Sequence, residues 1–484
     1  MTKKNPFYIT TTIPYVNADP HIGFALELVQ SDAIARYQRI IGREVFFSTG
    51  TDEHGQKIWE ASQKEGKTVQ DYVDYYAKKF LDLKNILNLS YDNFIRTINP
   101  LHIQAVQEFW RLCFEQGDIY KKKYKGLYCV GCEKFITEKD LIDGKCLLHP
   151  LQKPEVVEEE DYFFKLTNYR KKLLEYLSKE KVIIPEWRRI EAIDFVKDGM
   201  EDFSISRSKE RFSWGVPIPG DESQIMYVWF DAFINYISTL GWPRSAEASG
   251  EGDLDNLFEK FWINGEKVQT AGKDMVKFQS VMWQGMLMSA GLPTTDKIVY
   301  HGFITGEGGI KMSKSIGNVI NPNDIVKEYG TDALRYFLLR EISPFEDSPF
   351  TMERFKDAYN ANLANGLGNL VSRILTMAEN YNVSLIDSIF DRTDLDIQDF
   401  DVKKYMDKIW IKIQEADKKI QEKEPYKLFK TKKDFAIEIV SDLCTDLSII
   451  AKLLLPTMPE TAEKILYYLK ENKKPEKPLF LRKD

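Results

Sequence analysis

Two lysines in a glycine-rich segment are the first residues whose type and spacing suggest chemistry. Residues 306–315 read GEGGIKMSKS and follow a strand-like run at residues 298–305. Glycines allow a loop to move, and Lys311 and Lys314 lie three residues apart. Cationic side chains of this kind bind phosphate oxygens. The segment therefore predicts a mobile loop that carries positive charge to a polyphosphate.

A histidine near the N-terminus could contact the same kind of ligand. His21 and Gly23 follow a strand-like run at residues 7–13 and stand where an apolar helical pattern begins. A helix N-terminus attracts anions through its free N–H groups and its dipole, and an imidazole adds a donor. Gly23 lets a ligand approach the backbone closely. The pair predicts an anion site at the start of this helix.

The cysteines have the spacing of a metal site. Cys129 and Cys132 form one close pair, and after thirteen residues Cys146 and His149 form another. Two such pairs predict one tetrahedral Zn²⁺, which is structural because protein fills all four positions. Binding worth ~10–16 kcal/mol would replace a missing apolar core. The odd total of five cysteines argues against a disulfide framework.

The elements that must position these residues alternate between strand and helix. Residues 7–13 and 44–48 predict strands, and residues 22–41, ended by Gly42, predict the helix between them. This order indicates a parallel sheet, in which ligands bind beyond the carboxyl ends of the strands. Residues 121–149 break the pattern, and strand-like runs return at 225–230 and 298–305. From about residue 357 the pattern is helical, and residues 473–484 predict an extended strap.

Composition limits the possible classes. The length of 484 residues predicts about three domains. Hydrophobic residues make up 43% of the chain and charged residues 29%, which is typical of globular proteins. The net charge of −7 excludes a uniformly basic nucleic-acid binder, but residues 403–433 hold eleven lysines against five acidic residues. No apolar run reaches the ~18 residues of a membrane span, and the N-terminus lacks the apolar core of a signal peptide. A cytoplasmic protein is expected.

Taken with further motifs, these signals resemble a known family. The motifs are HIG at 21–23, KMSKS at 311–315, TIPYVN at 12–17, TDEHG at 51–55, YVWFDA at 227–232, GKD at 272–274 and DALRY at 332–336. Together they resemble the class I aminoacyl-tRNA synthetases, in particular the methionyl-tRNA synthetases with a single zinc knuckle. The resemblance covers nearly the whole chain.

The resemblance implies an α/β fold in which a zinc-containing connective domain splits a Rossmann-like parallel sheet and an α-helical bundle follows. The implied parts are the first half of the catalytic domain (1–116), the connective domain with its zinc knuckle (117–219), the second half with the lysine loop (220–325), a stem-contact linker (326–356) and an anticodon-binding domain (357–484). The implied activity is methionine–tRNA ligation through methionyl-adenylate. Its partners are methionine, ATP with Mg²⁺, and tRNA(Met) including the initiator, with no membrane and a monomer expected.

The family's functional residues are implied at matching positions of this chain. The implied catalytic residues are His21, Lys311, Lys314 and Arg207, and the implied ATP contacts are His21, Gly23, Gly272, Asp274, Lys311, Ser313 and Lys314. The implied methionine pocket comprises Ile13, Tyr15, Asp52, Trp229, Ala232, Tyr236, Met275, Phe278 and Gln279, with Asp52 pairing the ammonium. Asn369, Arg373 and Tyr426 match anticodon-contacting positions, and Cys129, Cys132, Cys146 and His149 match the zinc ligands.

Three positions depart from the family's pattern. Phe24 stands where a second signature histidine is usual, and a phenyl ring donates no hydrogen bond to phosphate. Gln279 stands where a histidine often lines the pocket, and Tyr426 where a tryptophan is usual. Two alternatives therefore stay open. One is a class I synthetase for another amino acid such as cysteine, leucine or valine. The other is a catalytically silent paralogue that binds tRNA.

Overall fold

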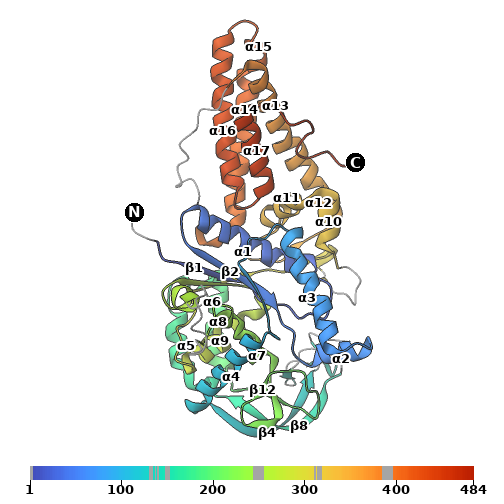
Figure 1. The fold of residues 1–484 in the computed structure, drawn as a ribbon, viewed down its shortest axis with the longest axis vertical. Coiled ribbons are helices and arrows are strands. Elements are labelled where there is room, and N and C mark those ends of the chain that lie inside the picture. The colour runs from blue at the N-terminus through green and yellow to red at the C-terminus, as the bar shows by residue number, and fades with distance from the viewer. Residues whose placement is uncertain are drawn as a thin grey trace. The chain divides into compact units, whose positions relative to one another are not determined.

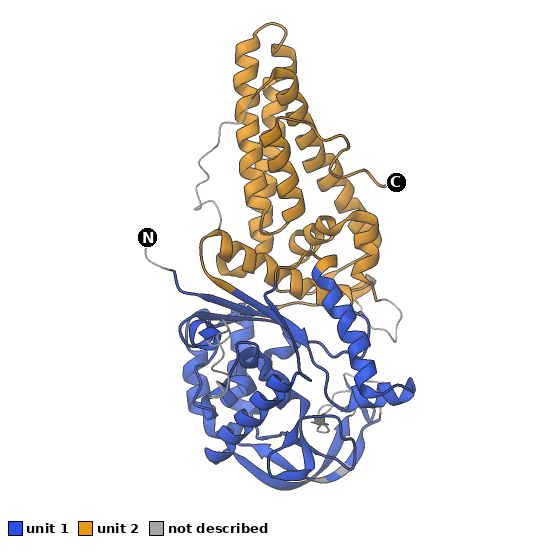
Figure 2. Cartoon of the chain, viewed as in Figure 1, with its two compact units in different colours: residues 1–20, 46–84, 91–300 blue, residues 21–45, 85–90, 301–484 orange. Residues whose placement is uncertain are grey.

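The computed structural model describes residues 4–129, 134–136, 138, 141–147, 153–243, 256–309, 312, 319–383 and 396–484. The chain forms two compact units, coloured separately in Figure 2. Unit 1 comprises residues 1–20, 46–84 and 91–300, and unit 2 comprises residues 21–45, 85–90 and 301–484. No helix in the described ranges is long and apolar enough to cross a membrane.

A six-stranded sheet lies almost entirely in unit 1, and its strands β1 and β2 are labelled in Figure 1. Its order is β3 (Asn93–Arg96), β2 (Val45–Thr51), β1 (Phe7–Thr10), β14 (Glu266–Gly272), β15 (Lys297–His301) and β9 (Ile183–Ile184). The pairs β2–β3, β1–β14 and β15–β9 are parallel. All four residues of β1 are buried, as expected for a parallel strand covered on both faces. This confirms the predicted parallel α/β sheet.

The helices of unit 1 are short or amphipathic. They are α2 (Gln56–Lys64), α3 (Val69–Ile86, whose last two residues belong to unit 2), α4 (Pro100–Glu115), α5 (Arg170–Leu177), α6 (Glu186–Asp194), α7 (Val228–Phe233), α8 (Asn235–Ser238) and α9 (Trp283–Ser289). Aromatic side chains from several of them share one core; for example, Phe109 of α4 stacks on Trp283 of α9 at 5.8 Å.

Smaller antiparallel sheets occupy the stretch between the two halves of the main sheet. One has the order β10 (Phe203–Ser204), β8 (Glu155–Phe164), β4 (Ile119–Cys129), β5 (Lys134–Ile136). A second has β11 (Ser206–Ser208), β13 (Asp221–Met226) and β12 (Pro217–Ile218), and a hairpin joins β6 (Leu141–Ile142) to β7 (Lys145–Cys146). The described residues of the predicted insertion at 121–149 thus lie mainly in β-strands.

Unit 2 is mainly helical and holds the two-stranded sheet β16 (Ile304–Thr305) and β17 (Ser348–Pro349). Its helices are α1 (Ile22–Ile40), α10 (Pro322–Tyr329), α11 (Thr331–Tyr336), α12 (Met352–Ala358), α13 (Asn369–Tyr381), α14 (Val402–Lys423), α15 (Pro425–Leu428), α16 (Lys433–Leu454) and α17 (Pro459–Glu471). This confirms the helical second half that the sequence predicts.

A buried ion pair attaches α1 to the rest of unit 2. The Arg335 guanidinium and the Asp32 carboxylate are both fully buried, 2.8 Å apart. Arg335 also donates to the carbonyls of Leu87 and Thr457. Although burial opposes ionisation, Arg335 and Arg36 lower the pKa of Asp32. Buried charges persist when paired and hydrogen-bonded in this way, so these contacts hold the middle of α1 in place.

The C-terminal segment docks as the predicted strap. The Asn360 side chain donates to the Lys483 carbonyl at 2.7 Å and accepts from the Lys483 N–H at 2.9 Å. The Tyr359 hydroxyl donates to the Leu481 carbonyl, and the Phe480 ring is buried. The strap therefore packs against the turn of π-helix at Tyr359–Gly368, directly before α13.

Three predicted strands were partly wrong. Residues 7–13 form a strand only to Thr10. The predicted strand 225–230 ends at Met226, and Val228 begins the short helix α7. The prediction failed here because a buried apolar run has no periodicity that distinguishes a strand from a helix. The predicted strand 298–305 is interrupted at Gly302, where a Cβ would lie 2.1 Å from the Glu346 backbone.

Candidate functional site

The predicted histidine lies at the head of α1 in unit 2. His21 is the N-cap residue, and its Nδ1 accepts the Gly23 N–H at 3.1 Å. In the neutral imidazole the proton is then on Nε2, which can donate to an anion. A Cβ on residue 23 would lie 3.0 Å from two atoms of this ring, so a side chain here would press on the imidazole of His21.

A backbone hydrogen bond within unit 2 links the first turn of α1 to the described chain that follows the lysine motif. The Ile22 N–H, in the first turn of α1, donates to the Ile320 carbonyl at 3.0 Å. Ile320 lies five residues after the lysine motif KMSKS ends. Lys311, Ser313 and Lys314 themselves lie outside the described residues. The hydrogen bond ties residue 320 to the head of α1.

Predicted ligand contacts in unit 1 lie where three neighbouring parallel strands end. Tyr15 follows β1, Asp52 follows β2, and Asp274 follows β14, whose last residue is Gly272. Because β2, β1 and β14 are adjacent and parallel where paired, their carboxyl ends meet at one edge of the sheet. The Asp274 side chain is exposed there, in the turn Lys273–Met275.

Asp52 and Tyr15 are held next to each other by backbone pairing. The Asp52 N–H donates to the Pro14 carbonyl at 2.9 Å, and the Val16 N–H donates to the Asp52 carbonyl at 3.2 Å. Asp52 is buried, while Tyr15 and Ile13 are half-buried. This places a carboxylate beside an aromatic ring, an arrangement suited to an ammonium group.

Four more of the predicted methionine contacts form a compact set. The rings of Trp229 and Phe278 stack with centroids 3.9 Å apart. The Tyr236 hydroxyl donates to Oε1 of Gln279 at 3.2 Å. Nε1 of Trp229 and Nε2 of Gln279 are buried donors without a hydrogen-bond partner in the described structure. Buried donors of this kind are costly unless something satisfies them, and a polar ligand group could do so.

The remaining two members of the predicted pocket adjoin this set. Ala232 is half-buried on α7, one turn after Trp229. Met275 is half-buried in the turn after β14 and packs against the same core as Trp229 and Phe278. A thioether side chain beside aromatic rings is a favourable environment for another sulfur or an apolar chain.

Arg207, a predicted catalytic residue, is buried among side chains of unit 1. It is 2% exposed, donates to the Ser206 carbonyl at 2.5 Å, and lies over the Tyr227 ring at 4.3 Å. Burial disfavours its charge, but Tyr128 and Asp161 outweigh burial and hold the pKa of Arg207 above its usual value. The guanidinium therefore packs against Tyr227, the residue that precedes α7.

Sequence reasoning missed a buried carboxylate behind the pocket. Asp231 accepts hydrogen bonds from His54 and His102. Burial raises the pKa of a carboxyl group, but here the two histidines lower the pKa of Asp231 to about 2. Asp231 lies in the motif YVWFDA and His54 in the motif TDEHG, but a single sequence does not show that residues so far apart in the chain meet.

The predicted anticodon contacts lie in unit 2. Asn369 begins α13 and is exposed, and Arg373 follows one turn later on the same helix. Arg373 forms an ion pair with Asp417 of α14, whose second oxygen accepts from the Gln421 amide at 2.5 Å. Tyr426, on α15, is 47% exposed. An exposed aromatic ring is available to stack on a base.

Two predicted zinc ligands are described, and they lie in one small cluster. Cys129 ends β4 and Cys146 ends β7; both are buried and pack with Ile136. Cys132 and His149 lie outside the described residues, and among those described no three metal-binding side chains are grouped. So small a core in this region fits a segment that a metal holds together.

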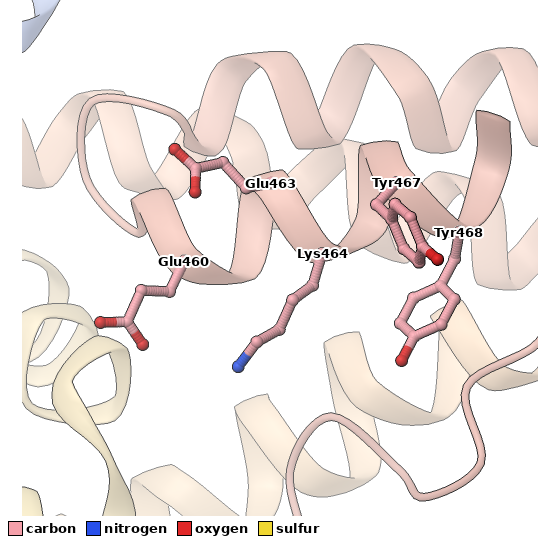
Figure 3. A pocket seen from close by; sticks show the side chains of 5 residues that line it. All are labelled: Glu460, Glu463, Lys464, Tyr467 and Tyr468. Atoms are coloured by element: carbon pink, nitrogen blue, oxygen red, sulfur yellow. The ribbon is translucent and has the colours of Figure 1, made fainter. Parts of the chain in front are cut away.

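A pocket on α17 is separate from all of these residues. It measures about 400 Å³ and is lined by Glu460, Glu463, Lys464, Tyr467 and Tyr468 (Figure 3). All five belong to one helix, and none is a candidate contact. The pocket therefore adds nothing to the candidate site.

Comparisons with known proteins agree with this geometry. The family described as tRNA synthetases class I (M) matches residues 7–149 and 136–375. The methionine–tRNA ligase of Caldanaerobacter subterraneus subsp. tengcongensis is 40% identical, over 96% of this chain and 74% of its own. That of Thermotoga maritima is 39% identical, over 97% and 76%.

A solved structure gives the same result in three dimensions. Mycobacterium tuberculosis methionyl-tRNA synthetase in complex with methionyl-adenylate superimposes with a TM-score of 0.86 at 36% identity, over 96% of this chain and 93% of that one. The apo form of the same enzyme gives a TM-score of 0.80 over 99% and 98%. The chain therefore belongs to the class I tRNA synthetases, in the methionyl family that these relatives represent.

Proposed function

We propose that this chain is a methionine–tRNA ligase that activates methionine with ATP and transfers it to the 3′ end of tRNA(Met), including the initiator. The observation that supports this most strongly is its likeness, over almost the whole chain, to a synthetase bound to methionyl-adenylate, the intermediate of that reaction. The edge of the sheet in unit 1 supplies a carboxylate and aromatic rings of the kind that this amino acid requires.

The first step joins the amino acid to AMP. The methionine carboxylate attacks the α-phosphorus of ATP, the bond from that phosphorus to the bridging oxygen breaks, and pyrophosphate leaves. A carboxylate is already nucleophilic, so no protein base is needed, and catalysis comes from positioning and charge stabilisation. Enzymes of this family use ATP with Mg²⁺, which shares the pyrophosphate charge. His21 donates from Nε2, and we assign Lys311 and Lys314 to the phosphates.

In the second step a ribose hydroxyl of the tRNA 3′ end attacks the adenylate carbonyl. The bond between the carbonyl carbon and the phosphate oxygen breaks, AMP leaves, and the hydroxyl proton is released. Asp52 pairs the methionine ammonium, and we assign Gly23, Gly272, Ser313 and the exposed Asp274 to ATP. We further propose that residues 357–484 bind the anticodon and that residues 117–219 form the connective domain.

ATP–pyrophosphate exchange tests this assignment directly. We expect exchange that depends on methionine, with much weaker exchange for leucine, cysteine, valine and homocysteine. Lys314→Ala should lower the exchange rate by about 10²–10³, the usual effect of losing one charge-stabilising donor. Strong exchange with another amino acid and none with methionine would contradict the assignment. Equal background rates in wild type and variant would instead favour a silent paralogue.

Gly23→Ala tests the role of His21 through its packing. The new Cβ would lie 3.0 Å from the imidazole and displace it, while alanine favours the helix. We expect kcat for exchange to fall by about 10- to 100-fold with an unchanged or raised thermal midpoint. Gln30→Ala, on the same helix, is the control and should retain both values. Wild-type activity in Gly23→Ala would contradict both the close approach of ATP to Gly23 and the need for this exact position of the His21 ring.

Arg373→Ala tests the proposed anticodon contact. Losing one base contact costs ~1–3 kcal/mol, so kcat/KM for tRNA should fall by about 10- to 100-fold. Methionine-dependent pyrophosphate exchange should be unchanged, because that step needs no tRNA. The control is Lys403→Ala, which removes a half-buried cation paired with Asp407 on α14. A parallel loss of both activities would mean that Arg373 serves the fold instead.

We propose one structural Zn²⁺ held by Cys129, Cys132, Cys146 and His149. Elemental analysis of protein purified without chelator should give about one zinc per chain, as the two-pair spacing implies. Cys146→Ser should lose the metal and lower the thermal midpoint. Cys444→Ser changes a buried cysteine of α16 and should keep the zinc. A zinc-free wild-type protein would refute the site.

A further inference from the structure

A buried carboxylate in unit 1 is shared by two histidines. Asp231 is 0% exposed; its Oδ2 lies 2.6 Å from Nδ1 of His54, and its Oδ1 lies 2.9 Å from Nε2 of His102. Nδ1 of His102 lies 2.8 Å from the Ser238 hydroxyl. An ionised carboxylate only accepts hydrogen bonds, so both histidines donate to it. Of the five histidines in the chain, two are committed to this one group.

Asp231 lies on the back of the helix that carries the pocket tryptophan. Helix α7 has only six residues, too few to be stable without tertiary contacts. At 100° per residue, Trp229 and Ala232 lie on one side of α7 and Asp231 on the opposite side. The stack of Trp229 on Phe278 holds the front of the helix. The two histidine hydrogen bonds hold its back.

The same carboxylate is linked to the other wall of the proposed pocket. His54 lies two residues after Asp52, and His102 lies in the first turn of α4. The segment around His54 is itself fixed, because Nε1 of Trp214 donates to the Glu53 carbonyl at 2.6 Å. Through His54, Asp231 therefore connects two parts of the proposed pocket. One is the segment that carries Asp52, the proposed partner of the ammonium group, and the other is α7, which carries Trp229.

We propose that Asp231, His54 and His102 are positioning residues for methionine, setting the spacing between Asp52 and Trp229 and thereby the length of side chain that fits. This inference rests on the proposed function, since it assigns Asp52 to the ammonium and Trp229 to the thioether. The three residues touch neither ATP nor the reacting carboxylate in this scheme. Their loss should therefore affect the binding of the amino acid more than that of the nucleotide.

Matched variants can remove or keep each hydrogen bond. An asparagine amide can replace the Nδ1 donor of a histidine, and a glutamine amide can replace the Nε2 donor. His54→Asn and His102→Gln thus retain the donor to Asp231, whereas His54→Leu and His102→Asn lose it. Asp118→Asn is the control, because Asp118 is a second buried carboxylate of unit 1 whose partners are Asn168, Tyr169 and Ser289.

The readouts are KM for methionine, KM for ATP and kcat in pyrophosphate exchange, with the thermal midpoint measured for each variant. The donor-deleting variants should raise KM for methionine about tenfold, leave KM for ATP within about twofold, and discriminate less against leucine and homocysteine. The donor-retaining variants should stay within about threefold of wild type. Asp118→Asn should lower the thermal midpoint without moving KM for methionine.

Three results would overturn the inference. An unchanged KM for methionine in His54→Leu and His102→Asn would show that the network does not set the spacing between Asp52 and Trp229. Equal changes in both KM values, following the thermal midpoint and shared by Asp118→Asn, would show a purely structural role. Donor-retaining variants as impaired as donor-deleting ones would give the same conclusion. Wild-type protein that fails to exchange with methionine would refute the proposed function and this inference with it.

Discussion

Parallel pairing is the constraint on which the proposed amino-acid site depends. Because β1 pairs with β14 and lies next to β2, the segments that leave these strands start from the same edge of the sheet. Tyr15, Asp52 and Asp274 come from segments far apart in the chain, and each follows one of these strands. An antiparallel arrangement would send neighbouring segments to opposite edges and disperse the three residues. The chemistry thus begins with the direction of the strands.

Buried charges then fix the positions of helices that strand pairing does not hold. In unit 1 the Asp231 carboxylate takes one hydrogen bond from each of two histidines, and in unit 2 Asp32 pairs with Arg335. A buried charge is expensive unless its partners are in place, so each network has one acceptable geometry. Short elements benefit most: α7 has six residues, and α11, which carries Arg335, also has six.

Close packing between His21 and Gly23 orients the imidazole at the head of α1. His21 caps the helix through Nδ1, and the glycine at residue 23 leaves the ring room, since a Cβ there would lie 3.0 Å from it. The cap in turn decides which nitrogen carries the proton, and so which nitrogen can meet a phosphate. Phe24, next in the chain, replaces the histidine usual in the family, and the lone imidazole of His21 is thus the donor that this signature retains.

The sequence by itself determined the class of fold and the position of His21 at a helix start, and it predicts the two nucleotide signatures. These follow from local properties: apolar periodicity, glycine and cap residues, and the identity of side chains within short motifs. The spacing of the cysteines likewise predicts a zinc site whose described ligands, Cys129 and Cys146, lie in one cluster. The docking of residues 473–484 was also readable, because an apolar pair in an extended, proline-containing tail favours a strap.

Only the tertiary structure decided which distant residues meet. Met226 ends a strand and Val228 starts a helix although both belong to one apolar run, because burial on all sides removes the period that distinguishes the two. Likewise, His102 meets Asp231 and Arg373 meets Asp417 across separations of 129 and 44 residues. Such partners are selected by the packing of whole elements and by the need to satisfy buried charge, and neither is encoded within a short stretch of sequence.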